Sequence, residues 1–171
     1  MSAPLQIRPG TPDDAPAVAR LINAVIAEGA PVLLTGSFSD EQERAFLEEL
    51  APRGGFHVAE TRDADGASTL VAAQVFAPYA EAMPAHDHVA VMGTWVDAAW
   101  RRRGAGRSLW ERTEALARSR GFTRVFTDVR ADNLDSLAYH LALGFGVAGV
   151  ARALAVIDGR AYDVVFIERG L

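Results

Sequence analysis

The chain has 171 residues, of which 50% are hydrophobic, so it is long enough to form one domain, residues 1–171, around a sizeable core. Its net charge of −5 argues against a nucleic-acid-binding protein, because such proteins usually carry a basic face. The absence of cysteine excludes disulfides, a thiol nucleophile and thiolate metal sites, and it fits a cytoplasmic location. The first residues lack the features of a signal peptide, and no apolar run approaches the roughly 20 residues that cross a membrane.

The chain begins with a predicted strand and a predicted helix. Residues 5–8 favour a short strand, and Thr11 followed by Pro12 is typical of a helix start. Apolar residues recur at spacings of three and four between Val18 and Val25, so this helix should bury one face.

The segment GAPVLLTGSFS, residues 29–39, shows neither the helical nor the strand period. It is either a loop near a functional site or a plain connection between helices. A second helix is expected over residues 40–50. Its cap would be Ser39 or Asp40, its apolar stripe Phe46, Leu47 and Leu50, and its end would be marked by Pro52 and Gly54.

From residue 55 onward the pattern changes to strands. Residues 56–60, 69–79 and 88–96 predict three strands, separated by the polar turn RDADG and by the segment AEAMPAHD. An antiparallel meander is the simplest arrangement for them. Gly104, Ala105 and Gly106 should then open a helix that ends near Gly121.

The last third of the chain predicts a strand, a helix and a hairpin. Residues 123–130 have the composition of a strand, and a short helix follows. Residues 147–157 and 162–168 flank Asp158 and Gly159, a two-residue turn of type I′. The apolar stripe of the short helix should be Leu134, Leu137, Ala138 and Leu141, with Gly144 as the stop. The element order therefore predicts an α/β fold, a mixed sheet with helices on its faces.

The pattern Arg101-x-x-Gly104-x-Gly106 lies between a strand and a helix and predicts an anion site. The first N–H groups of a helix have no internal partner, and the helix dipole and nearby arginines favour negative charge there. The pattern is neither a Walker loop nor a dinucleotide fingerprint. A phosphate or pyrophosphate is therefore expected at this turn.

Three ordered motifs carry a family resemblance. They are Val96 with the glycine turn, then Asp128-Val129-Arg130-Ala131-Asp132-Asn133, then Leu143-Gly144-Phe145. Together they closely resemble the GCN5-related N-acetyltransferases over about residues 90–146. The resemblance implies a central, splayed, mostly antiparallel sheet flanked by about four helices. It also implies an acetyl-CoA-dependent enzyme that transfers an acetyl group directly to a primary amine, without a metal.

The resemblance assigns acetyl-CoA to an opening between the strands that end near Val96 and Arg130. Backbone N–H groups of the glycine turn would hold the pyrophosphate, and the strand at 94–96 would pair with the pantetheine arm. Asn133 is either a helix cap or a cofactor contact; with Ser136 and His140 it shares one helix face. The expected cofactor contacts are Thr94, Trp95, Val96, Arg101, Arg102, Arg103, Gly104, Ala105, Gly106, Arg107, Ser108, Asn133 and Ser136.

The sequence offers two candidates, His140 and Tyr139, for the acid that protonates the leaving thiolate. Many relatives have a tyrosine seven residues after the asparagine, where this chain has His140, and Tyr139 stands one position too early. An imidazole can also donate to a thiolate, although a helix histidine is often a packing or capping group. Asp128 is a candidate base, or the partner of a neighbouring cation, and His88 is a further candidate. His86 and His88 show a His-x-His spacing, but no third metal ligand is evident.

The amine acceptor is not specified by the sequence. The segment at 29–39, the segment AEAMPAHDH and the last hairpin should line the acceptor side, with Glu28, Thr35 and Phe38 as substrate contacts. Small amines are expected, such as amino acid analogues, polyamines or antibiotic-like amines. Alternatives are a protein N-terminal or lysine acetyltransferase, and an inactive acyl-CoA-binding or regulatory module. Many relatives pair, so a homodimer is possible.

Overall fold

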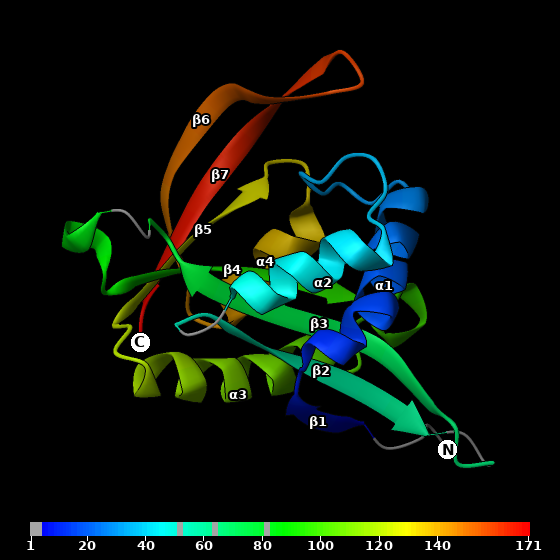
Figure 1. Ribbon diagram of the computed structural model, residues 1–171. Coiled ribbons are helices and arrows are strands. Elements are labelled where there is room, and N and C mark those ends of the chain that lie inside the picture. Colours follow the sequence, from blue (N-terminus) through cyan, green and yellow to red (C-terminus); the bar gives the residue numbers. More distant parts are fainter. Residues whose placement is uncertain (1–4, 51–52, 63–64, 81–82) are drawn as a thin grey trace.

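The computed structural model describes residues 5–50, 53–62, 65–80 and 83–171 (Figure 1). Its strands and helices, in chain order, are β1 (Gln6–Pro9), α1 (Ala15–Ala27), α2 (Asp40–Glu49), β2 (Gly55–Arg62), β3 (Ser68–Pro78), β4 (Val89–Val96), α3 (Ala105–Ser119), β5 (Arg124–Arg130), α4 (Leu134–Ala142), β6 (Gly146–Ile157) and β7 (Arg160–Gly170). Short 3₁₀ turns, η1 (Pro12–Asp14), η2 (Pro84–His86) and η3 (Ala98–Trp100), precede α1, β4 and α3.

The strands form one sheet in the order β1-β2-β3-β4-β5-β7-β6. Every neighbouring pair is antiparallel except β4 and β5, which run parallel. The predicted meander of β2, β3 and β4 and the predicted mixed sheet are therefore confirmed.

The parallel pair β4–β5 separates after two residues. Val89 pairs with Arg124 and Ala90 with Val125, and the ladder then ends. Two residues further along each strand, the Thr127 hydroxyl donates a hydrogen bond of 2.9 Å to the Met92 carbonyl oxygen. Beyond this point β4 stays paired with β3 up to Val96, while its other edge faces a gap. We call this gap the β4–β5 opening; it is the splay expected from the family resemblance.

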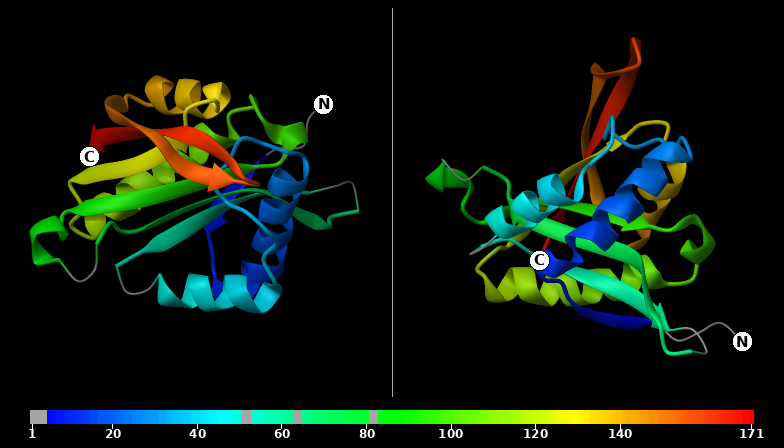
Figure 2. Two further views of the ribbon diagram at one scale, coloured as in Figure 1. Left: turned by 90° about the horizontal axis from the view of Figure 1, so that it is seen from above. Right: turned by 45° about the vertical axis from the view of Figure 1, so that its right-hand side comes forward.

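Helices cover both faces of the sheet, with α1 and α2 on one face and α3 and α4 on the other (Figure 2). On the α3–α4 face, Trp110, Phe122 and Phe145 pack with residues of β4, β5 and β7. On the α1–α2 face, Val18 and Leu47 pack against β2 and β3. The two faces of the sheet thus have separate apolar cores.

Two expected apolar stripes are only partly right. In α2 the cap at Ser39 is confirmed, because its hydroxyl accepts the Gln42 N–H, but Phe46 is 42% exposed and Glu43 is buried instead. In α4 only Leu137 of the expected stripe packs against the core, whereas Leu134 and Leu141 are 73% and 51% exposed. Tyr139 of α4 points inward because its hydroxyl bonds to Gln74 of β3 and to the Gly106 carbonyl oxygen of α3. The expected end of α2 at Pro52 lies outside the described residues.

The chain ends in the expected hairpin. Asp158 and Gly159 have φ values of 50° and 75°, as a type I′ turn requires. The hairpin of β6 and β7 extends away from the body of the molecule, and β6 forms one edge of the sheet (Figure 1).

Candidate active site

The glycine turn forms the N-terminus of α3 as expected. Gly104 is the N-cap with φ +88°, a conformation that residues with a Cβ atom rarely adopt. The first hydrogen bond of the helix joins the Ser108 N–H to the Gly104 carbonyl oxygen at 3.0 Å. The N–H groups of Ala105, Gly106 and Arg107 therefore have no partner within the helix. Because the Ser108 N–H is bonded to Gly104, the N–H groups available to an anion at this turn end at Arg107, one residue before the expected contact at Ser108.

The arginines of this turn have different surroundings. Arg101 donates from Nε to the Val96 carbonyl oxygen at 3.0 Å and forms an ion pair with Glu28. The Arg103 guanidinium lies over the Trp100 ring, and Arg107 donates to the Ala142 carbonyl oxygen at 3.4 Å. Arg101 is thus a support for the end of β4, whereas Arg102, which is exposed, forms no side-chain hydrogen bond within the described residues.

The free edge of β4 supplies main-chain groups to the opening. Main-chain groups of successive strand residues point to opposite sides of the strand. The Asp97 N–H bonds to Val71 of β3, whereas the Met92 carbonyl accepts from β5. This alternation directs the N–H groups of Thr94 and Val96 toward the β4–β5 opening, where they can pair with an extended ligand.

Trp95 lies on the α1–α2 face of β4, where it packs against the α1–α2 core. A Cβ atom added at Gly93 would lie 2.7 Å from the Trp95 ring, so that ring rests directly on the glycine. Trp95 therefore walls the opening on one side.

A group of buried polar side chains lies on the other side of β4. Gln74 of β3 is fully buried; its Nε2 donates to Thr94 Oγ1 at 2.8 Å and to the Tyr139 hydroxyl at 3.2 Å. The Tyr139 hydroxyl in turn donates to the Gly106 carbonyl oxygen at 2.9 Å. Burial raises the pKa of Tyr139 to about 12, so its phenol keeps its proton at neutral pH.

His140 is also buried, and it faces the interior of the protein. Its Nδ1 lies 2.7 Å from the Ser136 carbonyl oxygen, and because a carbonyl only accepts, Nδ1 carries the proton. The ring packs edge-on against Phe145. Burial lowers the pKa of His140, which favours the neutral ring. In this arrangement His140 has no second N–H to offer a thiolate.

Asn133 is both a helix cap and a loop anchor. Its Oδ1 accepts the Ser136 N–H at 3.0 Å, which makes it the N-cap of α4. Its Nδ2 donates to the Pro31 carbonyl oxygen at 2.9 Å, and Arg130 reaches the Val32 carbonyl oxygen at 3.4 Å. The segment 29–39 is thereby fixed to the ends of β5 and α4, next to the opening.

Asp128 is the unpaired acid of this region. It lies on β5 one residue after Thr127, directly opposite Phe166 of β7, and it is exposed. Within the described residues no cation pairs with it, unlike the ion pair that the sequence left open. Nearby protein atoms partly desolvate the carboxyl and raise its pKa above the usual range.

The remaining expected contacts divide into two groups. Glu28 reaches the end of β4 through Arg101, and Phe38 is fixed by Asn23, which bonds to both its N–H and its carbonyl oxygen at 2.9 Å. Thr35 lies in the same segment. His88, in contrast, precedes β4, eight residues and roughly 26 Å of extended strand from Val96. The structure does not bring His88 to the other candidate residues.

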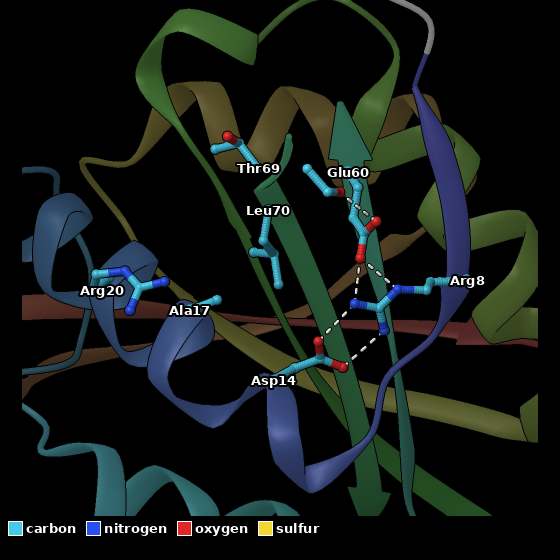
Figure 3. A pocket seen from close by; sticks show the side chains of 8 residues that line it. Arg8, Asp14, Ala17, Arg20, Glu60, Thr69 and Leu70 are labelled. Atoms are coloured by element: carbon cyan, nitrogen blue, oxygen red, sulfur yellow. Dashed lines mark hydrogen bonds and ion pairs between the residues drawn. The ribbon is translucent and has the colours of Figure 1, made fainter. Parts of the chain in front are cut away.

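A cavity of about 380 Å³ lies elsewhere, between β1, α1, β2 and β3 (Figure 3). Arg8 donates to the two Asp14 oxygens at 2.8 and 2.6 Å and forms an ion pair with Glu60. The Ser68 hydroxyl donates to the other Glu60 oxygen at 2.7 Å. We call these four residues the Arg8 cluster. Because its charges satisfy one another, this cavity is not the candidate active site.

Sequence reasoning missed two features of the fold: the hydrogen bonds of Gln74 with Thr94 and Tyr139, and the Arg8 cluster. Gln74 had a signal, since it is the single polar residue in the apolar run LVAAQVFA of β3. The Arg8 cluster joins residues up to 60 positions apart and had none.

No metal site is indicated within the described residues, because no three His, Cys, Asp or Glu side chains gather there. In the same part of the chain, none of the helices has the length and apolar character needed to span a membrane.

Comparison with known proteins gives consistent matches. The acetyltransferase (GNAT) family model matches residues 23–145. The phosphinothricin N-acetyltransferase of Streptomyces viridochromogenes is 28% identical over 166 residues, 97% of this chain and 87% of that protein. Its namesake from Streptomyces coelicolor is 26% identical over 170 residues, 99% and 98% of the two chains. A solved GNAT superfamily phosphinothricin acetyltransferase from Sinorhizobium meliloti, in complex with acetyl-CoA, has a TM-score of 0.85 at 18% identity, covering 98% of this chain and 88% of that one.

Proposed function

The chain belongs to the acetyltransferase (GNAT) family, and on that premise we propose that it transfers the acetyl group of acetyl-CoA directly to the primary amine of a small molecule. N-acetyltransfer is the activity of the family and of the named relatives. The observation that supports direct transfer is that β4 loses its β5 partner after Ala90, while Asp128 lies one residue beyond Thr127, whose hydroxyl makes the last contact between the two strands.

The donor side of the proposed reaction uses main-chain groups. The pyrophosphate of acetyl-CoA binds the free N–H groups at the start of α3, and the pantetheine arm pairs with Thr94 and Val96. The Val96 N–H stabilises the oxyanion that develops on the thioester carbonyl. Trp95 limits the size of the acyl group from the α1–α2 side.

The acceptor side of the proposed reaction centres on Asp128. Its carboxylate takes the proton that the ammonium must lose before the nitrogen attacks the thioester carbon. The new C–N bond forms, the C–S bond breaks, and the CoA thiolate leaves and takes up a proton. We propose water as the source of that proton, because the N–H of His140 and the O–H of Tyr139 both donate to carbonyl oxygens.

The substrate class proposed is small amines, with amino acid analogues first. Two relatives are named for phosphinothricin, an amino acid analogue, and support this order. Polyamines and antibiotic-like amines follow. A protein N-terminal or lysine acetyltransferase is the alternative within the family, and an inactive acyl-CoA-binding module is the alternative of another class.

Release of free CoA thiol tests this proposal. The purified protein is incubated with acetyl-CoA and, separately, phosphinothricin, spermidine, an aminoglycoside or a peptide with a free N-terminus. We expect release with a small amine and none without amine. Preference for the peptide would favour the protein-acetylating alternative. Intact acetyl-CoA with every amine, together with tight CoA binding, would establish the binding module instead.

We also propose that the protein is a cytoplasmic homodimer. Support for pairing comes from β6, a sheet-edge strand of 12 residues in which Val147, Val150, Leu154 and Val156 are more than half exposed. The mass in solution, measured by light scattering for the parent and for Val150→Arg, tests it; a monomeric parent contradicts the proposal.

A further inference from the structure

The buried polar group on the α3–α4 face connects two parts of the cofactor site that are separate in the sequence. Gln74 holds Thr94, whose main chain lines the opening, and it also holds the Tyr139 hydroxyl. Tyr139 holds the Gly106 carbonyl oxygen in the first turn of α3. One continuous chain of hydrogen bonds therefore runs from the pantetheine strand to the pyrophosphate turn.

The contact at Gly106 is close as well as polar. A Cβ atom at this position would lie 2.8 Å from Cε2 of Tyr139, so the aromatic ring packs directly against the glycine. A larger residue at position 106 would push the ring or the turn away. The hydroxyl and the ring of Tyr139 thus fix the first turn of α3 in two ways.

Gln74 is buried where its amide can bond only to groups of this hydrogen-bonded chain. It has 0% exposure in the middle of β3, and its Oε1 forms no hydrogen bond within the described residues. An amide with an unsatisfied buried oxygen destabilises a fold compared with an apolar side chain of similar size. Such a cost is typical of residues that serve a site rather than the stability of the core.

We propose that Gln74 and Tyr139 are positioning residues that set the spacing between the pyrophosphate turn and the β4 edge, so that one acetyl-CoA molecule can bind both at once. This inference rests on the proposed function for the identity of the ligand. It assigns Tyr139 a role in binding geometry, not in proton transfer. Its hydroxyl proton is already donated to Gly106, and its high pKa keeps it there.

The experiment compares a long ligand with a fragment of it. CoA must contact both the turn and the strand, whereas ADP carries the pyrophosphate and contacts the turn alone. Tyr139→Phe keeps the ring and removes both hydrogen bonds of the hydroxyl, the one from Gln74 and the one to Gly106, so we expect the Kd for CoA to rise about threefold to tenfold. The Kd for ADP, measured by the same titration calorimetry, should stay within twofold. Equal losses for CoA and ADP, or no loss for either, would overturn the proposal.

A second variant tests the connection itself. Gln74→Met has a similar size and cannot bond to Thr94 or Tyr139, and it should weaken CoA binding as Tyr139→Phe does. The double variant should be no weaker than the worse single variant, because both changes break one chain of contacts. Additive losses would contradict a shared connection. Tyr162→Phe, which removes a hydroxyl outside this group, is the matched control and should bind CoA as the parent does.

Turnover separates positioning from chemistry, with any amine that the thiol assay identifies. Tyr139→Phe should raise the KM for acetyl-CoA and leave kcat within about twofold, with the pH profile unchanged. A fall in kcat at unchanged KM would identify Tyr139 as the acid and overturn the positioning role. Because CoA binding needs no amine, absence of turnover in the parent would refute the proposed function alone and leave the positioning result standing.

Discussion

The Arg8 cluster and the β4–β5 opening are two polar regions of one sheet, and they differ in whether their polar groups have partners within the protein. In the Arg8 cluster every charged group is bonded to another, with Arg8 between two carboxylates that have little exposed surface. At the opening, the strand N–H groups have no strand partner and Asp128 has no ion-pair partner within the described residues. The comparison indicates that the first region stabilises the fold, while the second keeps its binding capacity for a ligand.

The largest effect is expected from Asp128→Asn. If Asp128 is the base, kcat/KM should fall by about 100-fold to 10,000-fold. Because the pKa of this carboxyl is raised in the folded state, its contribution to stability is present at low pH and is lost as the pH rises through that pKa. The variant should therefore melt at the same or a higher temperature at pH 7. Turnover and thermal unfolding are measured side by side, with Asp135→Asn, an exposed acid of α4, as control.

The same carboxyl predicts a pH dependence of the parent enzyme. Activity should fall on the acid side as Asp128 takes up a proton, with a midpoint above the ordinary aspartate pKa of about 3.9. A profile of kcat/KM against pH locates this limb. An acid limb that persists unchanged in Asp128→Asn would show that another group is responsible.

A smaller effect, on stability alone, is expected from Arg8→Met. Two partly buried carboxylates would lose their cation, which should cost about 2 kcal/mol, below the range for fully buried pairs. Burial alone would raise the pKa of Asp14, but the Arg8 hydrogen bonds outweigh it and lower that pKa; Ser68 and Arg8 lower the pKa of Glu60. These contributions are present above the unfolded pKa values and are lost as the pH falls.

Denaturant unfolding between pH 7 and pH 3 measures this loss, which should be weaker in Arg8→Met than in the parent. Arg44→Met breaks an exposed pair with Asp13 and should cost less than about 0.5 kcal/mol, so it is the matched control. A large fall in kcat/KM for Arg8→Met would contradict the division between the two regions.

A modest effect is expected from His140→Phe. The aromatic contact with Phe145 is kept and the bond to Ser136 is lost, which should cost about 1 kcal/mol of stability. Since burial favours the neutral ring, kcat should fall less than about tenfold. A fall of 100-fold together with loss of the basic limb of the pH profile would instead assign His140 as the acid.

The smallest effect is expected from Leu141→Ser. Its side chain is half exposed on the outer side of α4, so stability should change by less than about 0.5 kcal/mol. Denaturant unfolding measures the change, and a loss of more than 2 kcal/mol would restore the apolar stripe that the sequence predicted for this helix.

Local sequence patterns predicted the secondary-structure elements and the glycine turn well. The glycine turn, the order of strands and the Asp158–Gly159 hairpin each depend on neighbouring residues, and all are present in the structure. The buried side of α4 was predicted only in part, because hydrophobic spacing cannot reveal that Tyr139 bonds to Gln74 and Gly106 in the folded protein. The Arg8 cluster could not be predicted from local patterns either, since its members are distant in the sequence and meet only in the folded sheet.

The early end of the β4–β5 ladder has a consequence for self-association. An unpaired strand edge at the border of a sheet can recruit a strand from another molecule and start aggregation. Here the unpaired edge of β4 lies inside the sheet and faces β5 of the same chain. The Thr127 hydroxyl bonds to the Met92 carbonyl oxygen, which no strand partner satisfies. The backbone groups of β4 can therefore stay available to a ligand without forming a border edge that recruits a strand from another molecule.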